Sequence, residues 1–284
     1  MAEIGKTNSL RVVREVDFGV YLDGEELGEI LLPEKYLPKR WKVGDIMEVF
    51  IYLDSEDRLV ATTERPFAEV GDFALLKVVD LGPVGAFLGW GLPKDLLVPF
   101  REQKEKMAKG REYVVFVYLD KSNRIAASSR LDRFLGKEPA SFQADEEVEL
   151  LICDQTDMGY KAIINGAHGG VLYKNEVFQS LKNGQQIRGF IKKVRDDGKI
   201  DLSLQKPGPK KVDELSGKIL NALKEEGGFL SVTDKSLPKV INALFGCSKN
   251  TYKKAIGGLY KKRLITIEER GIRLCEKKKK EGQP

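Results

Sequence analysis

The ten residues VREVDFGVYL at positions 13–22 hold two short runs of β-branched and aromatic residues on either side of Gly19. Such runs predict two β-strands joined by a tight turn. The stretch returns at positions 79–88 as VDLGPVGAFL, and a shift of 66 residues gives 14 identities over the window 12–61. Chance gives roughly three identities at average residue frequencies. The chain therefore contains an internal repeat.

A third, more diverged copy follows the first two. In each copy a glycine is followed by a second glycine 25 residues later and by a phenylalanine six residues after that. The three sets are Gly19, Gly44 and Phe50; Gly85, Gly110 and Phe116; and Gly159, Gly184 and Phe190. A unit of this length is too long for a solenoid repeat and has the size of a complete small domain.

Each copy has the pattern of a small β-domain, with short β-branched runs separated by Gly, Asp and Asn. In copy one the predicted strands are Leu10–Val16, Gly19–Leu22, Gly28–Leu32, Ile46–Leu53 and Arg58–Thr63. In copy three they are Val148–Asp154, Tyr160–Ile164, Gly169–Tyr173, Gln186–Val194 and Ile200–Leu204. Five strands in about 60 residues predict a closed barrel of the OB type.

The pattern changes after the third copy, where a segment rich in Pro, Gly and Lys precedes three helical segments and a hairpin. Apolar spacing predicts a helix over 213–226. Ser236 is expected to cap a second helix that ends near Phe245, and Ser248 a third that ends near Arg263. The hairpin is expected from Leu264–Glu268 and Ile272–Cys275, and the third helix is expected to bury Tyr252, Ala255, Ile256 and Leu259. This order is typical of a winged helix-turn-helix.

The sequence therefore predicts a multidomain, mainly β protein with three tandem OB-type barrels and a C-terminal winged helix. The expected domains are barrels at 1–66, 67–140 and 143–206, a linker at 207–212, a winged helix at 213–276 and a basic tail at 277–284. The formal net charge of +5 divides into −4 over 1–206 and +9 over 207–284. A basic C-terminal quarter favours an acidic partner such as nucleic acid, although a solubilising lysine tail has the same composition.

The chain shows the features of a cytoplasmic protein. It lacks an apolar run of the ~18 residues that a membrane span needs, and its N-terminus lacks the apolar core of a signal peptide. Cys153, Cys247 and Cys275 are far apart and odd in number, which indicates reduced thiols rather than a disulfide frame or a zinc site.

The stretch at 13–22 resembles the strand signature of the S-one RNA-binding domain, an OB module, and residues 53–59 and 197–204 resemble its last turn and strand. Three such modules followed by a winged helix resemble the conserved virulence factor B family of bacterial RNA-binding regulators. The resemblance implies that each barrel holds RNA on two strand aromatics, a following histidine and an Asp/Arg pair.

No copy carries the whole set of residues that the resemblance implies. Copy one has Phe18, Tyr21, Asp54 and Arg58, with Pro33 at the histidine position. Copy two has Phe87, Asp120 and Arg124, with Val84 and Pro99 at the other positions, and could be a spacer. Copy three has Met158, Lys161, Tyr173, Arg195 and Lys199 at these positions, with Lys192 and Lys193 nearby.

Several of these residues also have a purely structural interpretation. Phe18, Tyr21 and Phe87 are either stacking platforms for bases or ordinary barrel residues. Trp90 is either a platform or the anchor of its loop. In the third helix the cations Lys249, Lys253, Lys254, Lys261, Lys262 and Arg263 either contact phosphates or form a solvated face.

The residues argue against an enzyme, a cofactor or a metal site. His168 is the sole histidine, and the glycines around it match neither dinucleotide-binding nor phosphate-loop spacing. The expected function is therefore regulation of gene expression by a monomer that binds single-stranded RNA and no membrane. Two alternatives stay open, a transcription regulator that binds DNA through the winged helix and a module that docks on ribosome or polymerase.

Overall fold

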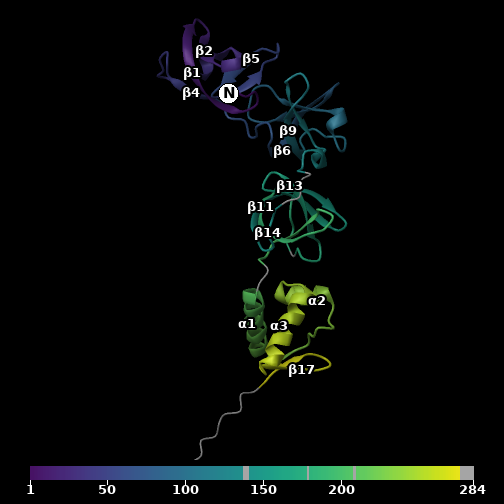
Figure 1. Ribbon diagram of the computed structural model, residues 1–284. Coiled ribbons are helices and arrows are strands. Elements are labelled where there is room, and N and C mark those ends of the chain that lie inside the picture. The colour runs from purple at the N-terminus through teal and green to yellow at the C-terminus, as the bar shows by residue number, and fades with distance from the viewer. Residues whose placement is uncertain (137–140, 178, 207–208, 276–284) are drawn as a thin grey trace, which may run out of the picture. The chain divides into compact units, whose positions relative to one another are not determined.

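The computed structural model describes residues 1–136, 141–177, 179–206 and 209–275, and the side chains from 214 onward in the first helix. The basic tail expected at 277–284 lies outside these residues. Three closed five-stranded β-barrels are followed by a small domain of three helices and a three-stranded sheet (Figure 1). The predicted fold class, mainly β with three OB-type barrels and a winged helix, is confirmed.

The strands of barrels one and three follow the predicted runs within a few residues. The first barrel contains β1 (Thr7–Val16), β2 (Gly19–Asp23), β3 (Glu29–Pro33), β4 (Ile46–Leu53) and β5 (Leu59–Thr62). The second contains β6 (Phe73–Gly82), β7 (Gly85–Gly89), β8 (Leu96–Pro99), β9 (Glu112–Leu119) and β10 (Ile125–Ser128). The third contains β11 (Glu147–Thr156), β12 (Gly159–Ile164), β13 (His168–Tyr173), β14 (Gln186–Val194) and β15 (Ile200–Ser203).

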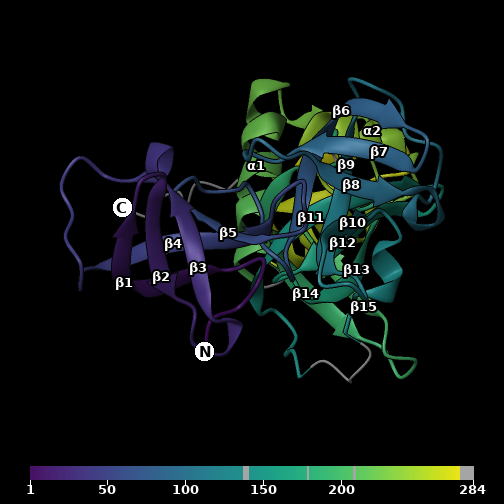
Figure 2. The same ribbon diagram turned by 90° about the horizontal axis from the view of Figure 1, so that it is seen from above.

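All three barrels have the same strand order, in which the fifth strand lies between the third and the fourth; Figure 2 shows β1, β2 and β3 of the first barrel side by side. The first strand of each barrel has a register shift at the same place, between Val12 and Arg14 in barrel one. An extra residue at such a bulge bends the strand and increases its twist, which lets one long strand pair with both neighbours of a closed barrel.

The repeated glycine that opens the second strand has a steric role. A Cβ on Gly19 would occupy the space of the Leu32 carbonyl oxygen, and one on Gly159 would meet that of Leu172 in the same way. Both glycines also have φ +151°, which L side chains rarely adopt. The second and third strands can therefore approach closely at this point only because the residue has no side chain.

The C-terminal domain contains α1 (Pro209–Glu225), β16 (Phe229–Leu230), α2 (Pro238–Phe245), α3 (Lys249–Lys261), β17 (Ile265–Ile267) and β18 (Ile272–Leu274). The sheet order is β16-β18-β17, so the predicted hairpin gains a third strand. The four residues predicted to be buried in α3 all lie in the core of this domain. Ser248 caps α3 as predicted, and its Oγ accepts a hydrogen bond from the Thr251 N–H at 3.2 Å.

Two local expectations for this domain are wrong. The first helix begins at Pro209, so part of the expected linker 207–212 is helical. Proline is well suited to the first turn of a helix, because the backbone N–H that it lacks would have no acceptor within the helix there. Ser236 does not cap α2, because its Oγ accepts from the Thr233 N–H at 2.9 Å and so closes the preceding turn. The N-cap residue of α2 is Leu237, and its side chain makes no capping hydrogen bond.

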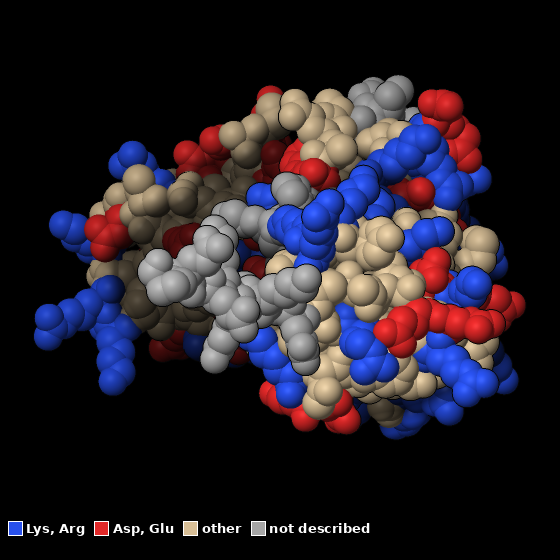
Figure 3. Space-filling model, turned by 90° about the horizontal axis from the view of Figure 1, so that it is seen from below, with Lys and Arg blue, Asp and Glu red and all other residues tan. Residues whose placement is uncertain are grey.

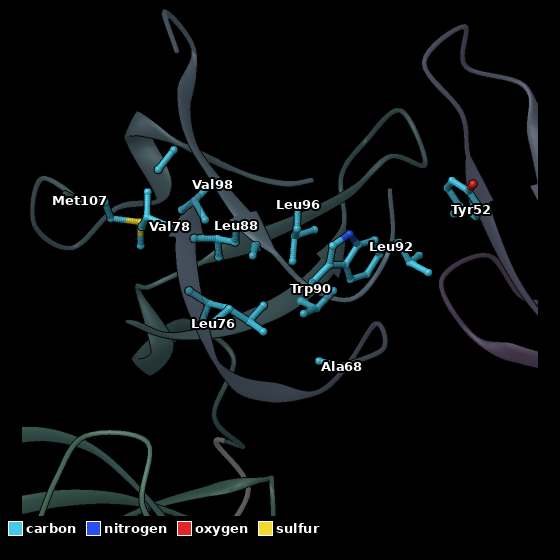
Figure 4. Close-up of a cluster of buried hydrophobic side chains, with 14 of the residues drawn as sticks. Tyr52, Ala68, Leu76, Val78, Leu88, Trp90, Leu92, Leu96, Val98 and Met107 are labelled. Carbon is cyan, nitrogen blue, oxygen red and sulfur yellow. The ribbon is translucent and has the colours of Figure 1, made fainter. Parts of the chain in front are cut away.

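The first two barrels form one compact unit, and they share a hydrophobic cluster. Phe50 and Tyr52 of β4 contribute to the cluster from the first barrel, and Trp90 and Leu92 contribute from the second. Figure 4 shows Tyr52, Trp90 and Leu92 of this cluster. The Phe50 and Trp90 rings meet edge to face with centroids 5.7 Å apart. Trp90 is only 3% exposed, and its indole N–H donates to the Lys94 carbonyl at 2.7 Å. Trp90 is therefore a loop anchor and not an exposed platform.

Candidate nucleic-acid interface

A backbone hydrogen bond defines equivalent positions on the three barrels. The residue after the third strand donates its N–H to the carbonyl of the residue before the second strand. The bonds are Glu34 to Phe18 at 3.0 Å, Phe100 to Val84 at 3.3 Å and Lys174 to Met158 at 2.9 Å. Each bond holds the backbones of two residues together beside the second and third strands. We call these surfaces the outer faces of barrels one, two and three.

The outer face of barrel one contains both aromatic residues predicted from the repeat. Phe18 is 56% exposed at the turn that precedes β2. Tyr21 is half-buried, and the Arg14 guanidinium lies 4.0 Å from its ring centroid while pairing with Glu29 at 2.7 Å. One side of Tyr21 is therefore already covered by a cation, whereas Phe18 is open to a ligand.

The Asp/Arg pair of barrel one is formed as the resemblance implies. Arg58 pairs with Asp54 at 2.7 Å and with Glu56 at 2.9 Å, and its side chain stays largely exposed. Burial acts to raise the pKa of Asp54, but hydrogen bonds from the Arg58 side chain and from backbone N–H groups outweigh it and hold the pKa below its ordinary value. The pair therefore fixes the β4–β5 turn and leaves part of the guanidinium accessible.

Barrel two differs from the pattern expected for its Asp/Arg pair. Asp120 accepts hydrogen bonds from backbone N–H groups, including that of Arg124 at 3.1 Å. The Arg124 guanidinium instead pairs with Asp57 of barrel one, so it acts at the junction of the two barrels. Lys94 adds to this junction by donating to the Leu53 carbonyl at 3.0 Å.

Phe87 lies half-buried on the outer face of barrel two, where its ring occupies the space above Gly82. Phe100, which the sequence analysis missed, is 53% exposed and is held beside Val84 by the backbone bond described above. The position that matches Phe100 is an acid, Glu34, in barrel one, so comparison of aligned residues does not single it out.

In barrel three the structure brings together Tyr173 and Arg195, two of the predicted residues, with Asp201, which the sequence analysis missed. The Tyr173 hydroxyl donates to Asp201 at 3.1 Å, and Arg195 contacts both of them, reaching Asp201 at 2.9 Å. Burial and the Asp201 hydrogen bond raise the pKa of Tyr173. The hydrogen bond to Asp201 likewise raises the pKa of Arg195, so its cation is held at one end of the barrel.

The lysines predicted around this end of barrel three differ in their partners. Lys192 pairs with Glu176 at 2.5 Å, and Lys199 pairs with Asp197 at 3.0 Å, which lowers the pKa of Asp197. Lys193 is exposed, and Lys161 lies opposite Asp154 in the β11–β12 register. The positive end of barrel three is therefore balanced in part by its own acids.

Five of the six cations predicted in and just after α3 are exposed. Lys253, Lys254 and Lys261 are exposed, and none of them has an ion-pair partner among the residues that the structure describes. Tyr260, which the sequence analysis missed, is exposed on the same helix. Lys249 is half-buried at the start of α3, and Lys262 and Arg263 are exposed just beyond its end. Figure 3 shows one face of the molecule, on which Lys and Arg side chains are spread with Asp and Glu between them.

The described part of the chain offers no helix long and apolar enough to cross a membrane. Nor do the described residues contain a group of three or more His, Cys, Asp or Glu side chains placed to hold a metal ion. The faces described above carry exposed aromatic rings and cations, with acids between them, and such rings and cations suit stacked bases and phosphates.

Comparison with known proteins agrees with this architecture. The S1 domain, which is the S-one module, matches residues 4–64 and 70–130, and a CvfB-like winged helix domain matches residues 217–274. The YitL protein of Bacillus subtilis is 28% identical over 275 residues, covering 90% of this chain and 89% of that protein. Conserved virulence factor B of Staphylococcus aureus is 25% identical over 244 residues, covering 83% and 81%.

A solved multidomain protein with nucleic acid binding domains from Streptococcus pneumoniae is 24% identical, with a TM-score of 0.40, and covers 96% of this chain and 98% of that chain. Barrels that match the S1 domain, followed by a winged helix, define a class of nucleic-acid-binding proteins. Within that class, the chain belongs to the conserved virulence factor B family.

Proposed function

We propose that this protein binds single-stranded RNA in the cytoplasm and regulates gene expression after transcription, without catalytic activity, cofactor or membrane partner. The observation that carries the proposal is the outer face repeated on three barrels, with exposed Phe18 on the first and Phe100 on the second. An exposed ring can stack on a base only if that base is free of a duplex, so such faces favour single strands.

The cations on α3 and at the end of barrel three supply the second part of the proposed mechanism. They hold phosphates without regard to sequence, while the aromatic faces hold bases. We propose that the contacting cations and aromatics are those predicted from the sequence, except that Arg124 acts mainly at the junction of barrels one and two. We further propose that the protein acts as a monomer.

Fluorescence anisotropy at one salt concentration would test the proposal on the full chain. The probes are a labelled oligouridine, the same length of duplex RNA and the same length of duplex DNA. We expect the tightest binding to the oligouridine. Tighter binding to duplex DNA would overturn the proposal.

Tighter binding to duplex DNA would favour transcription regulation through the winged helix. One observation makes this the second candidate function. Lys253, Lys254 and Lys261 are exposed on α3, the helix that enters the DNA major groove in winged helix-turn-helix proteins. If this alternative holds, loss of these lysines would abolish duplex DNA binding, whereas loss of Phe18 would leave it unchanged.

A further inference from the structure

The loop between β7 and β8 of barrel two reaches the backbone of the first barrel. Its Lys94 ammonium donates to the Leu53 carbonyl at 3.0 Å and to the Asp54 carbonyl at 2.6 Å, where β4 ends and the β4–β5 turn begins. Hydrogen bonds from a charged donor are stronger than those between neutral groups. The loop is itself fixed, because the Lys94 carbonyl accepts from the indole of Trp90 in the cluster that the two barrels share. Barrel two therefore holds two carbonyls of barrel one in place.

A second contact from barrel two reaches the other half of the same turn. The Arg124 guanidinium pairs with the Asp57 carboxylate. Asp57 has φ +61°, a left-handed conformation that few residues other than glycine, asparagine and aspartate adopt readily. The matching residue in the β9–β10 turn of barrel two is Asn123, at φ +58°. The two turns thus share this backbone conformation, and the turn of barrel one is held in both of its halves by cations of barrel two.

The loop that holds the turn departs from the repeat in the sequence. A shift of 66 residues aligns Trp90, Leu92 and Lys94 of barrel two with Gly24, Glu26 and Gly28 of barrel one. Barrel one thus has two glycines and an acid where barrel two has two large apolar residues and a cation. Trp90 and Leu92 belong to the shared cluster, and Lys94 makes the contacts described above. These three differences between the copies therefore lie at the junction of the barrels.

The turn that barrel two holds carries Arg58, whose side chain is 66% exposed. Asp54 Oδ1 accepts the N–H groups of Glu56 at 2.8 Å and of Arg58 at 3.0 Å, and Asp54 Oδ2 accepts from the Arg58 guanidinium at 2.7 Å. The direction of the guanidinium therefore depends on where Asp54 is held, and Lys94 holds the Asp54 carbonyl. A group that is fixed before its ligand arrives loses less conformational freedom on binding.

We propose that Lys94 and Arg124 are positioning residues, through which barrel two holds Arg58 of barrel one ready for a phosphate of single-stranded RNA. The inference rests on the proposed function. Both cations already have partners in barrel one, so they act on the turn rather than on the ligand. RNA binding by barrel one therefore depends on barrel two, even though neither positioning residue touches the strand.

The test is a double-mutant cycle of Lys94→Met with Arg58→Ala in the full chain, with affinity for a labelled oligouridine measured by fluorescence anisotropy. Methionine keeps the length of the lysine side chain and removes its donor. We expect Lys94→Met to weaken binding about two- to fivefold in the wild type and to have no effect in the Arg58→Ala variant, because a positioning residue acts only through the group that it holds. An equal loss in both backgrounds, which direct contact with RNA would give, would overturn the inference. Wild-type affinity of either single variant would also overturn it.

Lys106→Met is the matched control, because Lys106 is an exposed lysine of barrel two outside the junction. The neighbouring residue, Met107, lies on the opposite side of barrel two from Tyr52 (Figure 4). Any change that Lys106→Met causes should be the same with and without Arg58. Lys94→Arg keeps a cationic donor and should retain most of the affinity that Lys94→Met loses. Equal losses in Lys94→Arg and Lys94→Met would contradict the positioning role.

A second measurement follows the position of Arg58 in the free protein. The Arg58 Nε–H donates to Asp54 Oδ2 at 2.9 Å, and nitrogen NMR relaxation gives the order parameter of this group. Lys94→Met should lower that order parameter and leave those of the β6 backbone unchanged. An unchanged order parameter of Arg58 would overturn this inference and leave the proposed function standing. Failure of the wild type to bind any single-stranded RNA would overturn both.

Discussion

Removal of the three exposed lysines of α3 should change how strongly salt weakens RNA binding. The variant carries Lys253→Ala, Lys254→Ala and Lys261→Ala. Their ammonium groups have no ion-pair partner among the described residues, so each is available to a phosphate. Because their side chains lie outside the core of the winged helix, the variant should fold normally.

The magnitude follows from counterion release. Each phosphate neutralised on a single strand contributes about 0.7 to the slope of log affinity against log salt concentration. Three contacts therefore contribute about two to the slope. The slope measured for the variant should be less steep than that of the wild type by up to this amount. Over a fourfold range of salt, a change of two in slope alters the ratio of the two affinities by roughly 16-fold.

The assay is anisotropy with labelled oligouridine at five or more salt concentrations, on the full chain. The control variant carries Lys218→Ala and Lys224→Ala, which removes exposed lysines of the same domain from α1. We expect its slope to match that of the wild type. An equal slope for the α3 variant and the wild type would refute the assignment of these lysines to phosphate contact. An equal decrease of the slope in the α3 variant and the control variant would show that only net charge matters.

Three further outcomes follow from the same structure. Trp90→Ala should destabilise the unit of the first two barrels by about 3–5 kcal/mol, measured by urea unfolding, because its indole fills the cluster that the two barrels share; a loss below about 1 kcal/mol would show that the cluster is not tightly packed. Phe18→Ala combined with Tyr21→Ala in the full chain should cost about 1–3 kcal/mol of RNA affinity per base lost, with little change in the salt slope; unchanged affinity would make both residues structural. Asp54→Asn should lower the melting temperature at pH 7, where the carboxylate is paired with Arg58, and the difference from the wild type should shrink as the pH falls below the ordinary pKa of about 4; a difference that does not depend on pH would contradict the lowered pKa of Asp54.

The repeat in the sequence determined the main features of the fold. Glycine must stand where the second and third strands meet, because a side chain at Gly19 or Gly159 would collide with a carbonyl of the neighbouring strand. The β-branched runs between the turns then fixed the strands. Local signals also predicted that Ser248 caps α3 and that Tyr252 is buried, because capping and helical periodicity depend on residues close in the chain.

Only the tertiary structure decided which side chains act together. Arg124 could be aligned with an Asp/Arg pair, yet its guanidinium reaches Asp57 of the other barrel, because the two barrels pack on a shared cluster. Asp201 joins Tyr173 through strand pairing between residues 28 positions apart. The sequence analysis missed Phe100 because its place on the outer face depends on the backbone hydrogen bond to Val84. A contact between residues so far apart in the chain leaves no periodic signal in the sequence.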